Sequence, residues 1–221
     1  MAQGRIEIEP GGPYRVHGVG LSRTAQVETE FGEPVDWEPE SPVPVDADPY
    51  EVCRCGRTST QPLCDRRGCE AGFDGTEVAD RGSRADRAYP YRGSGFEMSD
   101  DITLCSQAGY CGDRFTTVWD MLEDSGDPEV RARIRRMVML CPSGRLAYRA
   151  DGAEGPDEHA HGPGVSAIRG GPLWVRGGVE VLGADGHAYE VRHRMTLCRC
   201  GGSSNKPFCD GSHQTNGFRD G

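Results

Sequence analysis

Ten cysteines, gathered into three groups, constrain this chain more than any other feature. Two of the groups begin with a C-x-C pair, and residues so close in sequence cannot form a disulfide without strain. No apolar run typical of a secretory signal follows Met1, so we expect a cytoplasmic chain whose thiols stay reduced. Clustered, reduced cysteines indicate metal sites. The groups are Cys53, Cys55, Cys64 and Cys69; Cys105, Cys111 and Cys141; and Cys198, Cys200 and Cys209.

Composition narrows the classes of protein further. Only 35% of the 221 residues are hydrophobic, and the 32 glycines and 15 prolines favour a loop-rich fold of short strands over one large apolar core. The longest apolar stretch runs from Met137 to Cys141, far short of a bilayer span, so we expect no membrane segment. A formal net charge of -10 argues against nucleic acid as a partner, since binding would require the neutralisation of phosphates.

An internal repeat frames the chain. The string Gly-Pro-Tyr-Arg-Val-His-Gly at residues 12–18 recurs as Gly-Pro-Leu-Trp-Val-Arg-Gly at residues 171–177, and each copy leads to a C-x-C pair and later to a Gly-Phe pair. Polar and apolar residues alternate at 5–9 and 179–181, which is typical of half-exposed strands. Each copy is therefore predicted to be a small antiparallel β unit that carries one metal loop.

An acidic segment interrupts the first copy between Thr24 and Cys53. It contains no basic residue, nine acidic residues and five prolines. Because proline lacks a backbone donor and restricts its neighbours, we expect an irregular, solvated loop. The alternative is that the segment forms a docking surface for a basic partner.

A different unit lies between the copies. Asp127 can cap a helix that has Pro128 at its first position. The apolar residues that follow have helical spacing and predict an amphipathic helix that ends at Cys141. They are Val130, Ile134, Met137 and Val138. A polar linker over residues 151–164 then leads to the second copy.

The last cysteine group brings three thiolates and an imidazole into one short segment, from Cys198 to His213. A C-x-C pair can place two sulfurs on one metal. Cys209 and His213 are four residues apart and would share a face if a helical turn begins near Asp210. This ligand set suits a 2Fe-2S cluster, with two thiolates on one iron and Cys plus His on the other, and it also permits zinc.

The full string from Cys198 to His213 resembles the CDGSH iron-sulfur domain of the mitoNEET-like proteins, because it matches C-x-C-x2-S/T-x3-P-x-C-D-G-S-H at every position. By this resemblance a 2Fe-2S cluster is bound by Cys198, Cys200, Cys209 and His213. A neutral imidazole ligand raises the reduction potential above that of an all-thiolate site. A proton can also compete for His213, so we expect acid to release the cluster.

The first copy keeps the family spacing for three ligands but departs from it at the fourth. The three are Cys53, Cys55 and Cys64. Gly68 stands at the position of His213 and offers no ligand. Cys69 follows directly and is the expected substitute, which would give four thiolates and a lower reduction potential. The alternative is a degenerate site that stays empty or is completed by another group.

The middle cysteine group has a different pattern. Cys105 and Cys111 enclose a C-x5-C loop, and Cys141 is followed by proline at the end of the predicted helix. This arrangement resembles divergent single-cluster ferredoxins, in which a C-x2-C-x2-C loop works with a remote Cys-Pro. Ala108 holds the central ligand position here, which favours a 3Fe-4S cluster on three cysteines. The alternatives are a 4Fe-4S cluster completed by water or by a residue such as Asp113, and three unligated thiols.

The two resemblances together imply an α+β fold, with two small antiparallel β CDGSH units that form an intramolecular pseudo-dimer and a small ferredoxin-like insert. The predicted domains are residues 1–82, 89–150 and 165–221. We expect a monomeric electron-transfer protein rather than an enzyme, with two 2Fe-2S clusters and one 3Fe-4S or 4Fe-4S cluster. The alternative is a cluster carrier, or a redox or pH sensor that releases the cluster held by His213. The partner would be a redox protein or an apo-acceptor.

Overall fold

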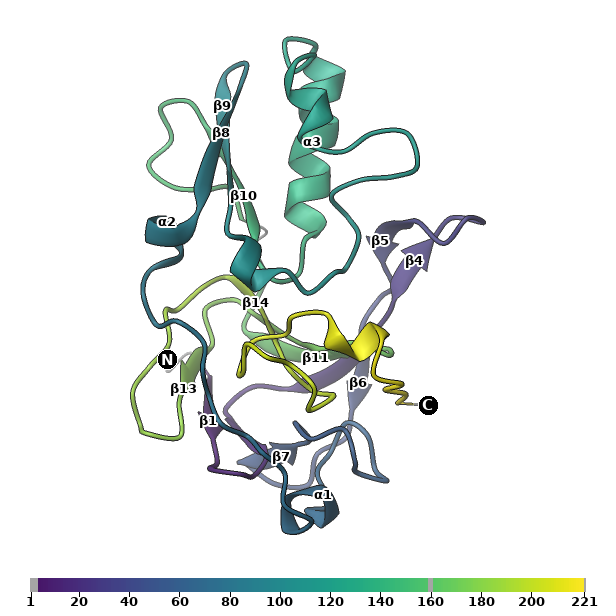
Figure 1. The fold of residues 1–221 in the computed structure, drawn as a ribbon, viewed down its shortest axis with the longest axis vertical. Helices are drawn as coiled ribbons and strands as arrows, with labels where there is room; N and C mark the ends of the chain where they lie inside the picture. The colour runs from purple at the N-terminus through teal and green to yellow at the C-terminus, as the bar shows by residue number, and fades with distance from the viewer. Residues whose placement is uncertain (1–3, 159–160, 221) are drawn as a thin grey trace.

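The protein's structure, a computed structural model, describes residues 4–158 and 161–220. It is an α+β fold of short strands and few helices. Figure 1 shows a β-rich region, drawn in the lower half, and a smaller region above it that contains helix α3 (Pro128–Leu140). None of the helices in these described residues is long and apolar enough to cross a membrane.

The β-rich region is built from the two sequence copies, and each copy supplies four strands. The first supplies β1 (Arg5–Ile8), β2 (Tyr14–His17), β3 (Leu21–Thr24) and β7 (Tyr50–Val52). The second supplies β11 (Gly164–Ile168), β12 (Leu173–Arg176), β13 (Glu180–Leu182) and β14 (Arg194–Leu197). They form a four-stranded sheet, β13-β1-β2-β7, and a five-stranded sheet, β14-β12-β11-β3-β6, whose last strand is β6 (Ser41–Val43). The strands predicted from the alternation at residues 5–9 and 179–181 are confirmed as β1 and β13.

The third strand of each copy pairs in the sheet of the other copy. Strand β3 lies parallel to β11, with Leu21 opposite Val165. Strand β13 lies parallel to β1, with Val181 opposite Ile6. The remaining pairs in both sheets are antiparallel. Each sheet is therefore mixed rather than antiparallel throughout, because the exchanged strand enters beside a first strand that runs in the same direction.

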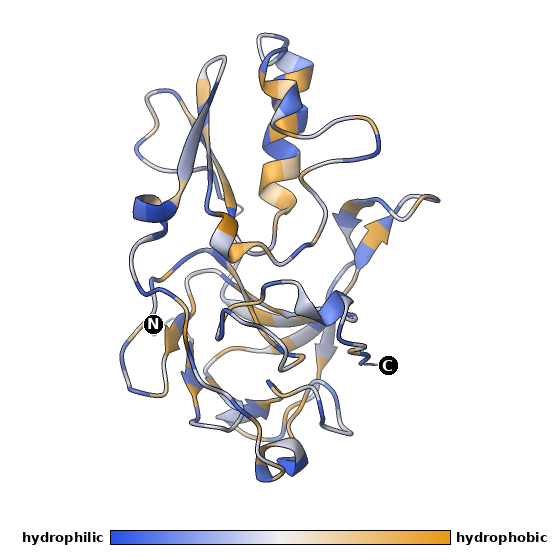
Figure 2. Ribbon diagram, in the orientation of Figure 1, coloured by the Kyte–Doolittle hydropathy of each residue, from blue (hydrophilic) through white to orange (hydrophobic). Residues whose placement is uncertain are grey.

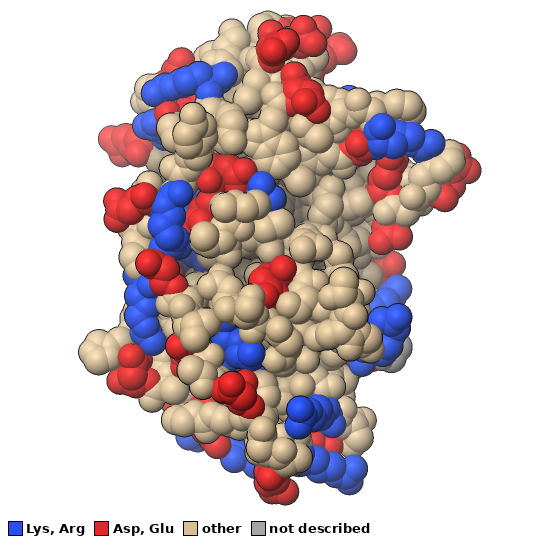
Figure 3. Space-filling model, viewed as in Figure 1, with Lys and Arg blue, Asp and Glu red and all other residues tan. Residues whose placement is uncertain are grey.

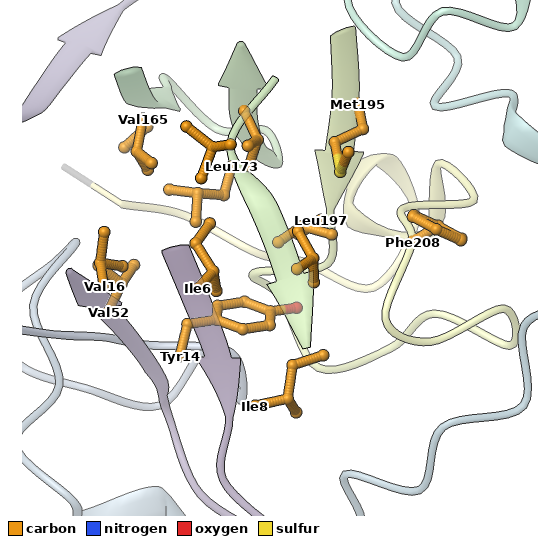
Figure 4. Close-up of a cluster of buried hydrophobic side chains, with 14 of the residues drawn as sticks. Ile6, Ile8, Tyr14, Val16, Val52, Val165, Leu173, Met195, Leu197 and Phe208 are labelled. Atoms are coloured by element: carbon orange, nitrogen blue, oxygen red, sulfur yellow. The ribbon is translucent and has the colours of Figure 1, made fainter. Parts of the chain in front are cut away.

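One core serves both copies, because the apolar faces of the two sheets meet (Figure 4). Ile6 and Val16 from the first copy and Val165 and Leu173 from the second have no exposed surface. The alternation along β1 directs Ile6 and Ile8 into this core. Since each such side chain contributes about 1.5–3 kcal/mol on full burial, separating the copies would remove the main source of stability from both.

The smaller region is a three-stranded antiparallel sheet packed against one helix. The sheet has the order β10-β9-β8 and consists of β8 (Tyr89–Gly93), β9 (Phe96–Asp100) and β10 (Leu146–Ala150). Helix α3 begins after Asp127, whose side chain accepts a hydrogen bond from the Glu129 N–H at 2.8 Å. Ile134 and Val138 are buried in the cluster that joins helix and sheet, and Figure 2 shows apolar and polar residues alternating along α3. The predicted capped amphipathic helix is confirmed.

The acidic segment is more regular than we expected. Strands β4 (Gln26–Glu28) and β5 (Pro34–Trp37) form a hairpin that projects beside the smaller region, and β6 follows (Figure 1). The prediction of an irregular loop was wrong because prolines occupy positions that strands tolerate. Pro34 begins β5, and Pro42 lies in β6, at the edge of its sheet.

Short helical turns complete the described chain. They are α1 (Arg67–Glu70), α2 (Arg84–Arg87), η1 (Ile102–Leu104), η2 (Asp120–Leu122) and η3 (Ser212–Gln214). Two of them, α1 and η3, follow the cysteine loops of the two copies, and they present the residues at the position of the fourth predicted ligand.

Candidate metal centres

The C-terminal cysteine loop follows β14 and folds back on it. Backbone hydrogen bonds of 2.8 Å and 2.9 Å from the N–H groups of Cys198 and Cys209 close the loop at both ends. The turn η3 then directs His213 toward Cys209. The four predicted ligands meet in two pairs: the Sγ atoms of Cys198 and Cys200 are 3.9 Å apart, and Cys209 Sγ lies 3.4 Å from His213 Nδ1.

These two pairs fit two tetrahedral metal positions. With metal–sulfur distances near 2.3 Å, two sulfurs on one tetrahedral metal are about 3.8 Å apart, and a sulfur and an imidazole nitrogen are about 3.5 Å apart. Among residues 4–158 and 161–220, no three His, Cys, Asp or Glu side chains converge on a point that a single ion could occupy. Each pair could supply two protein ligands to one metal position.

The pKa values of the four predicted ligands are shifted by burial and by their neighbours. The hydrogen bond that joins Cys198 and Cys200 lowers the pKa of Cys200 to about 6 and raises the pKa of Cys198. Burial raises the pKa of Cys209 to about 12. Burial, and to a smaller extent the Arg199 charge, lowers the pKa of His213, so its imidazole is neutral at pH 7 and able to bind a metal. Metal binding would therefore displace protons from Cys198 and Cys209.

Asp210 fixes the backbone around these ligands. One oxygen of its carboxylate accepts hydrogen bonds from the N–H and hydroxyl of Ser204 at 2.7 Å and 2.8 Å, and the other accepts from Ser212 at 3.0 Å and 2.6 Å. Burial opposes ionisation, but these hydrogen bonds outweigh it and lower the pKa of Asp210 to about 2. The carboxylate thereby ties the segment before Cys209 to the turn that carries His213.

The N-terminal loop repeats this geometry. Cys53 Sγ and Cys55 Sγ are 3.6 Å apart. Asp65 takes the place of Asp210 and accepts two hydrogen bonds of 2.9 Å from Ser59, which lower its pKa to about 2. The Thr58 hydroxyl donates to the Leu63 carbonyl at 2.9 Å, as the Ser203 hydroxyl of the other copy does to its Phe208 carbonyl at 2.7 Å.

Cys69, the predicted fourth ligand of the N-terminal loop, lies near two of the other three cysteines. A side chain at Gly68 is excluded, because a Cβ there would lie 2.3 Å from Cys55 Sγ. The thiol of Cys69 lies close enough that its charge helps to raise the pKa values of Cys55 and Cys64, the latter to about 12 with burial as the main cause. Helix α1 thus places Cys69 beside its predicted partners, although η3 places an imidazole there in the other copy.

A second substitution accompanies this change. Arg66 replaces the glycine of the C-terminal motif and keeps its left-handed backbone, with φ of 61° against 88° at Gly211. Such a conformation is unfavourable for a residue with a Cβ. Arg66 forms ion pairs with Glu9 at 2.9 Å and with Glu51, which hold it in place.

The two C-x-C loops lie against each other. The backbones of Cys55 and Cys200 form an antiparallel bridge, and the residues that follow, Gly56 and Gly201, both have positive φ. A Cβ on Gly56 would lie 2.7 Å from the Cys200 carbonyl oxygen, and one on Gly201 would lie 2.6 Å from that of Cys55. Bridged Cα atoms are about 4.5–5.5 Å apart, so the two donor sets are immediate neighbours.

The three middle cysteines line one small cavity at the base of the smaller region. Cys105, Cys111 and Cys141 surround it together with Ala108, whose methyl group stands at the predicted gap among the ligands. Arg145 lies in the same lining and donates to Cys105 Sγ at 3.2 Å. Burial raises the pKa of Cys111, partly against the opposing charge of Arg145. Three thiols and one cation therefore line this cavity, and its lining within the described residues contains no fourth sulfur.

Comparison with known families agrees with these three sites. The family described as iron-binding zinc finger, CDGSH type, matches residues 11–67 and 170–214, and the family described as divergent 4Fe-4S mono-cluster matches residues 91–151. The chain is a tandem CDGSH protein with a ferredoxin-like insert. No curated protein and no solved structure gives a significant match to it. Both families bind iron or an iron-sulfur cluster, so this is an iron-sulfur protein.

Three arginines, one of them fully buried, hold the Cys141 loop of this tandem CDGSH protein, and they were not among the residues predicted from the sequence. Arg194, whose side chain is fully buried, donates to the Cys141 carbonyl at 2.8 Å. Arg192 donates to the Ser143 carbonyl at 3.2 Å, and Arg84 donates to the Gly144 carbonyl at 2.7 Å. The available signal was the Arg-x-Arg pair just before the last C-x-C. Through Arg194, β14 of the second CDGSH copy positions a loop of the ferredoxin-like insert.

A second contact joins the insert to the C-terminal site. Gln214, next to His213, donates to the Gln107 carbonyl at 2.8 Å. The Gln107 side chain also lies against Gly211, where a Cβ would be 2.6 Å from it. The charge of Cys105 is near enough to help raise the pKa of Cys209. The loops that carry the three donor sets of the tandem CDGSH protein therefore touch in one order: middle, C-terminal, N-terminal.

Proposed function

We propose that this protein transfers electrons and is not an enzyme. The proposal includes two 2Fe-2S clusters in the CDGSH loops and a 3Fe-4S cluster on Cys105, Cys111 and Cys141, with 4Fe-4S as the alternative. The single observation that carries it is the contact between the loops that carry the three donor sets, through the Gln107–Gln214 hydrogen bond and the Cys55–Cys200 bridge. Iron-sulfur clusters supply one-electron redox chemistry when bound.

The residues of this chain would hold the three groups and separate their potentials. Cys53, Cys55, Cys64 and Cys69 supply four thiolates, which disfavour added negative charge more than a set with one neutral imidazole does. His213 therefore makes the C-terminal site the more easily reduced of the two CDGSH sites. Arg145, paired with Asp100 at 2.7 Å, places a cation beside Cys105 and favours negative charge at the middle site.

The two CDGSH copies are proposed to act as an intramolecular pseudo-dimer in a monomeric protein. The exchange of β3 and β13 and the shared core support this arrangement, since each sheet takes one strand from the other copy. Cross-copy contacts also reach the loops: the Tyr14 hydroxyl, from the first copy, donates to the Cys198 carbonyl at 2.8 Å. A rigid scaffold of this kind keeps the two donor sets at a constant separation.

Anaerobic purification, followed by iron and sulfide analysis and electron paramagnetic resonance, tests the proposal. We expect a coloured protein with sulfide in stoichiometric proportion to iron, and a signal near the free-electron value in the oxidised state from a three-iron centre. Absence of that signal from fully loaded protein would replace 3Fe-4S by 4Fe-4S in the middle site. A colourless protein, or one with stoichiometric zinc, would overturn the proposal.

A second candidate function is the delivery or loss of the cluster held by His213, as a carrier or as a redox or pH sensor. One observation favours it: a cavity of about 160 Å³, lined by His213, Gln214 and Gln107, reaches the imidazole. Solvent or an acceptor could approach the ligand through it. Transfer of iron and sulfide to an apo-ferredoxin, abolished by His213→Cys, would favour this function. Rapid reversible reduction with full retention of iron would favour electron transfer.

A further inference from the structure

The β4–β5 hairpin and the turn beside it carry exposed apolar side chains. The exposed fractions are 61% for Phe31 at its tip, 39% for Val27 and 40% for Val35. Phe115, in the neighbouring turn of the insert, is 85% exposed. Large apolar side chains gathered on one projection, rather than scattered singly, indicate an interaction site. We call these four residues the hairpin surface.

The hairpin surface is held in a fixed shape. The Arg114 guanidinium lies 3.2 Å from the centre of the Phe31 ring and 5.3 Å from that of Phe115, so one cation joins both aromatic rings. The Arg114 N–H also donates to the Glu33 carboxylate at 2.8 Å. Because the aromatic groups are already positioned, a partner would lose little side-chain entropy by ordering them.

The base of the hairpin rests on the middle cysteine loop. Gln26 donates to the Ala108 carbonyl at 2.5 Å, and the Tyr110 hydroxyl donates to the Asp36 carbonyl at 2.8 Å. A Cβ at Gly109 would lie 3.1 Å from Pro34. A partner seated on the hairpin surface would therefore approach the middle donor set.

The charged residues around the hairpin surface favour a partner with a basic surface. The arginines near the hairpin are already paired, Arg114 with Glu33 and Arg136 with Asp36. Glu28 and Glu30 lie beside the apolar residues and, within the described chain, take part in no ion pair; Figure 3 shows acidic atoms at the outer end of this projection. We propose that the hairpin surface docks a redox protein with a basic surface, an inference that rests on the proposed electron-transfer function. Electron-transfer complexes are small and are steered by charge, so a projection of this size suffices.

The test measures binding rather than electron flow. The probe is a basic c-type cytochrome in which zinc replaces the haem iron, so that the porphyrin is fluorescent and the metal does not change its oxidation state. It is titrated with the iron-loaded protein at low and at physiological ionic strength. We expect Glu28→Gln combined with Glu30→Gln to weaken binding about fivefold at low ionic strength and to reduce its salt dependence. Phe31→Ala should weaken binding about tenfold at either ionic strength.

Matched variants control for net charge and for loss of an aromatic ring. Asp86→Asn with Glu123→Gln removes the same charge from exposed positions outside the hairpin surface, and Tyr89→Ala removes a ring that is 66% exposed on β8. Equal loss in the controls, no loss in the hairpin variants, or tighter binding of an acidic flavodoxin would overturn the inference. If the iron analysis fails but the hairpin dependence holds, the proposed function falls and the docking surface stands; the reverse result removes the docking surface alone.

Discussion

The two CDGSH copies share a scaffold but differ at one ligand position. In both, a serine-bonded aspartate and a closed backbone loop set the first three sulfurs, as the contacts of Asp65 and Asp210 show. After the third sulfur the copies diverge: η3 presents His213, whereas α1 presents Cys69 one residue later. The comparison teaches that the shared scaffold ends in the same region of both copies, while the following helical turn decides which side chain, His213 or Cys69, is presented there.

Removal of Cys69 is the strongest test of this comparison. We expect Cys69→Ala to lose the N-terminal cluster, because only three ligands remain, and Cys69→His to retain it. Total iron and sulfide, with the visible spectrum, measure the loss against the unchanged C-terminal and middle sites. Full iron content in Cys69→Ala would mean that another group completes the site.

Exchange of the fourth predicted ligand between the copies should exchange their reduction potentials and their sensitivity to acid. We expect His213→Cys to lower the C-terminal potential by about 100 mV or more, since a thiolate adds negative charge. The neutral imidazole binds iron and its protonated form does not, so the native cluster should be lost as pH falls through the range in which His213 protonates, and His213→Cys should resist this loss. Potentiometry and the decay of visible absorption against pH measure both effects. Acid lability that does not change in His213→Cys would contradict this assignment, and Cys69→His supplies the reciprocal case.

Crowding between the loops should affect both copies alike. Gly56→Ala and Gly201→Ala each force a Cβ against the backbone of the opposite loop at a positive φ. We expect each to lower the free energy of unfolding by about 2–3 kcal/mol. Urea unfolding measures it, with Gly72→Ala, which has positive φ but open space, as the control for backbone strain alone. A difference between the two loop variants would mean that the copies are not equally close.

Replacement of Asp210 or Asp65 should give the smallest change in the free energy of unfolding. Asp210→Ala removes the hydrogen bonds that lower the pKa of Asp210 to about 2. Its contribution to stability is present above the unfolded pKa near 4 and is lost as pH falls toward 2. We expect Asp210→Ala to lower the free energy of unfolding by about 1 kcal/mol at pH 7, reduced by partial exposure of the carboxylate, and we expect Asp65→Ala to act in the same direction. If the native protein and Asp210→Ala differed in free energy of unfolding by the same amount at pH 7 and at pH 2.5, the role of Asp210 would be contradicted.

Structural features that depend on neighbouring residues could be predicted from the sequence, whereas pairing between distant segments could not. The C-x-C spacing, the capped helix at Asp127 and the gap at Ala108 are set by neighbours along the chain, so the pattern revealed them. The pairing of β3 with β11 joins segments far apart in sequence, and no local pattern specifies it. Pro34 led us to expect a loop because its place at the start of a strand could not be read from the sequence alone. The cluster-binding roles of the cysteines stay predictions.

The strand exchange takes place within a single polypeptide, and this has a genetic consequence. In a pair of identical subunits, a mutation of one ligand alters both sites at once. Here β3 and β13 cross between two segments that are encoded separately. One half can therefore change at its own positions, as at Arg66, Gly68 and Cys69, while the other keeps Gly211 and His213, so the two halves of one scaffold can diverge independently.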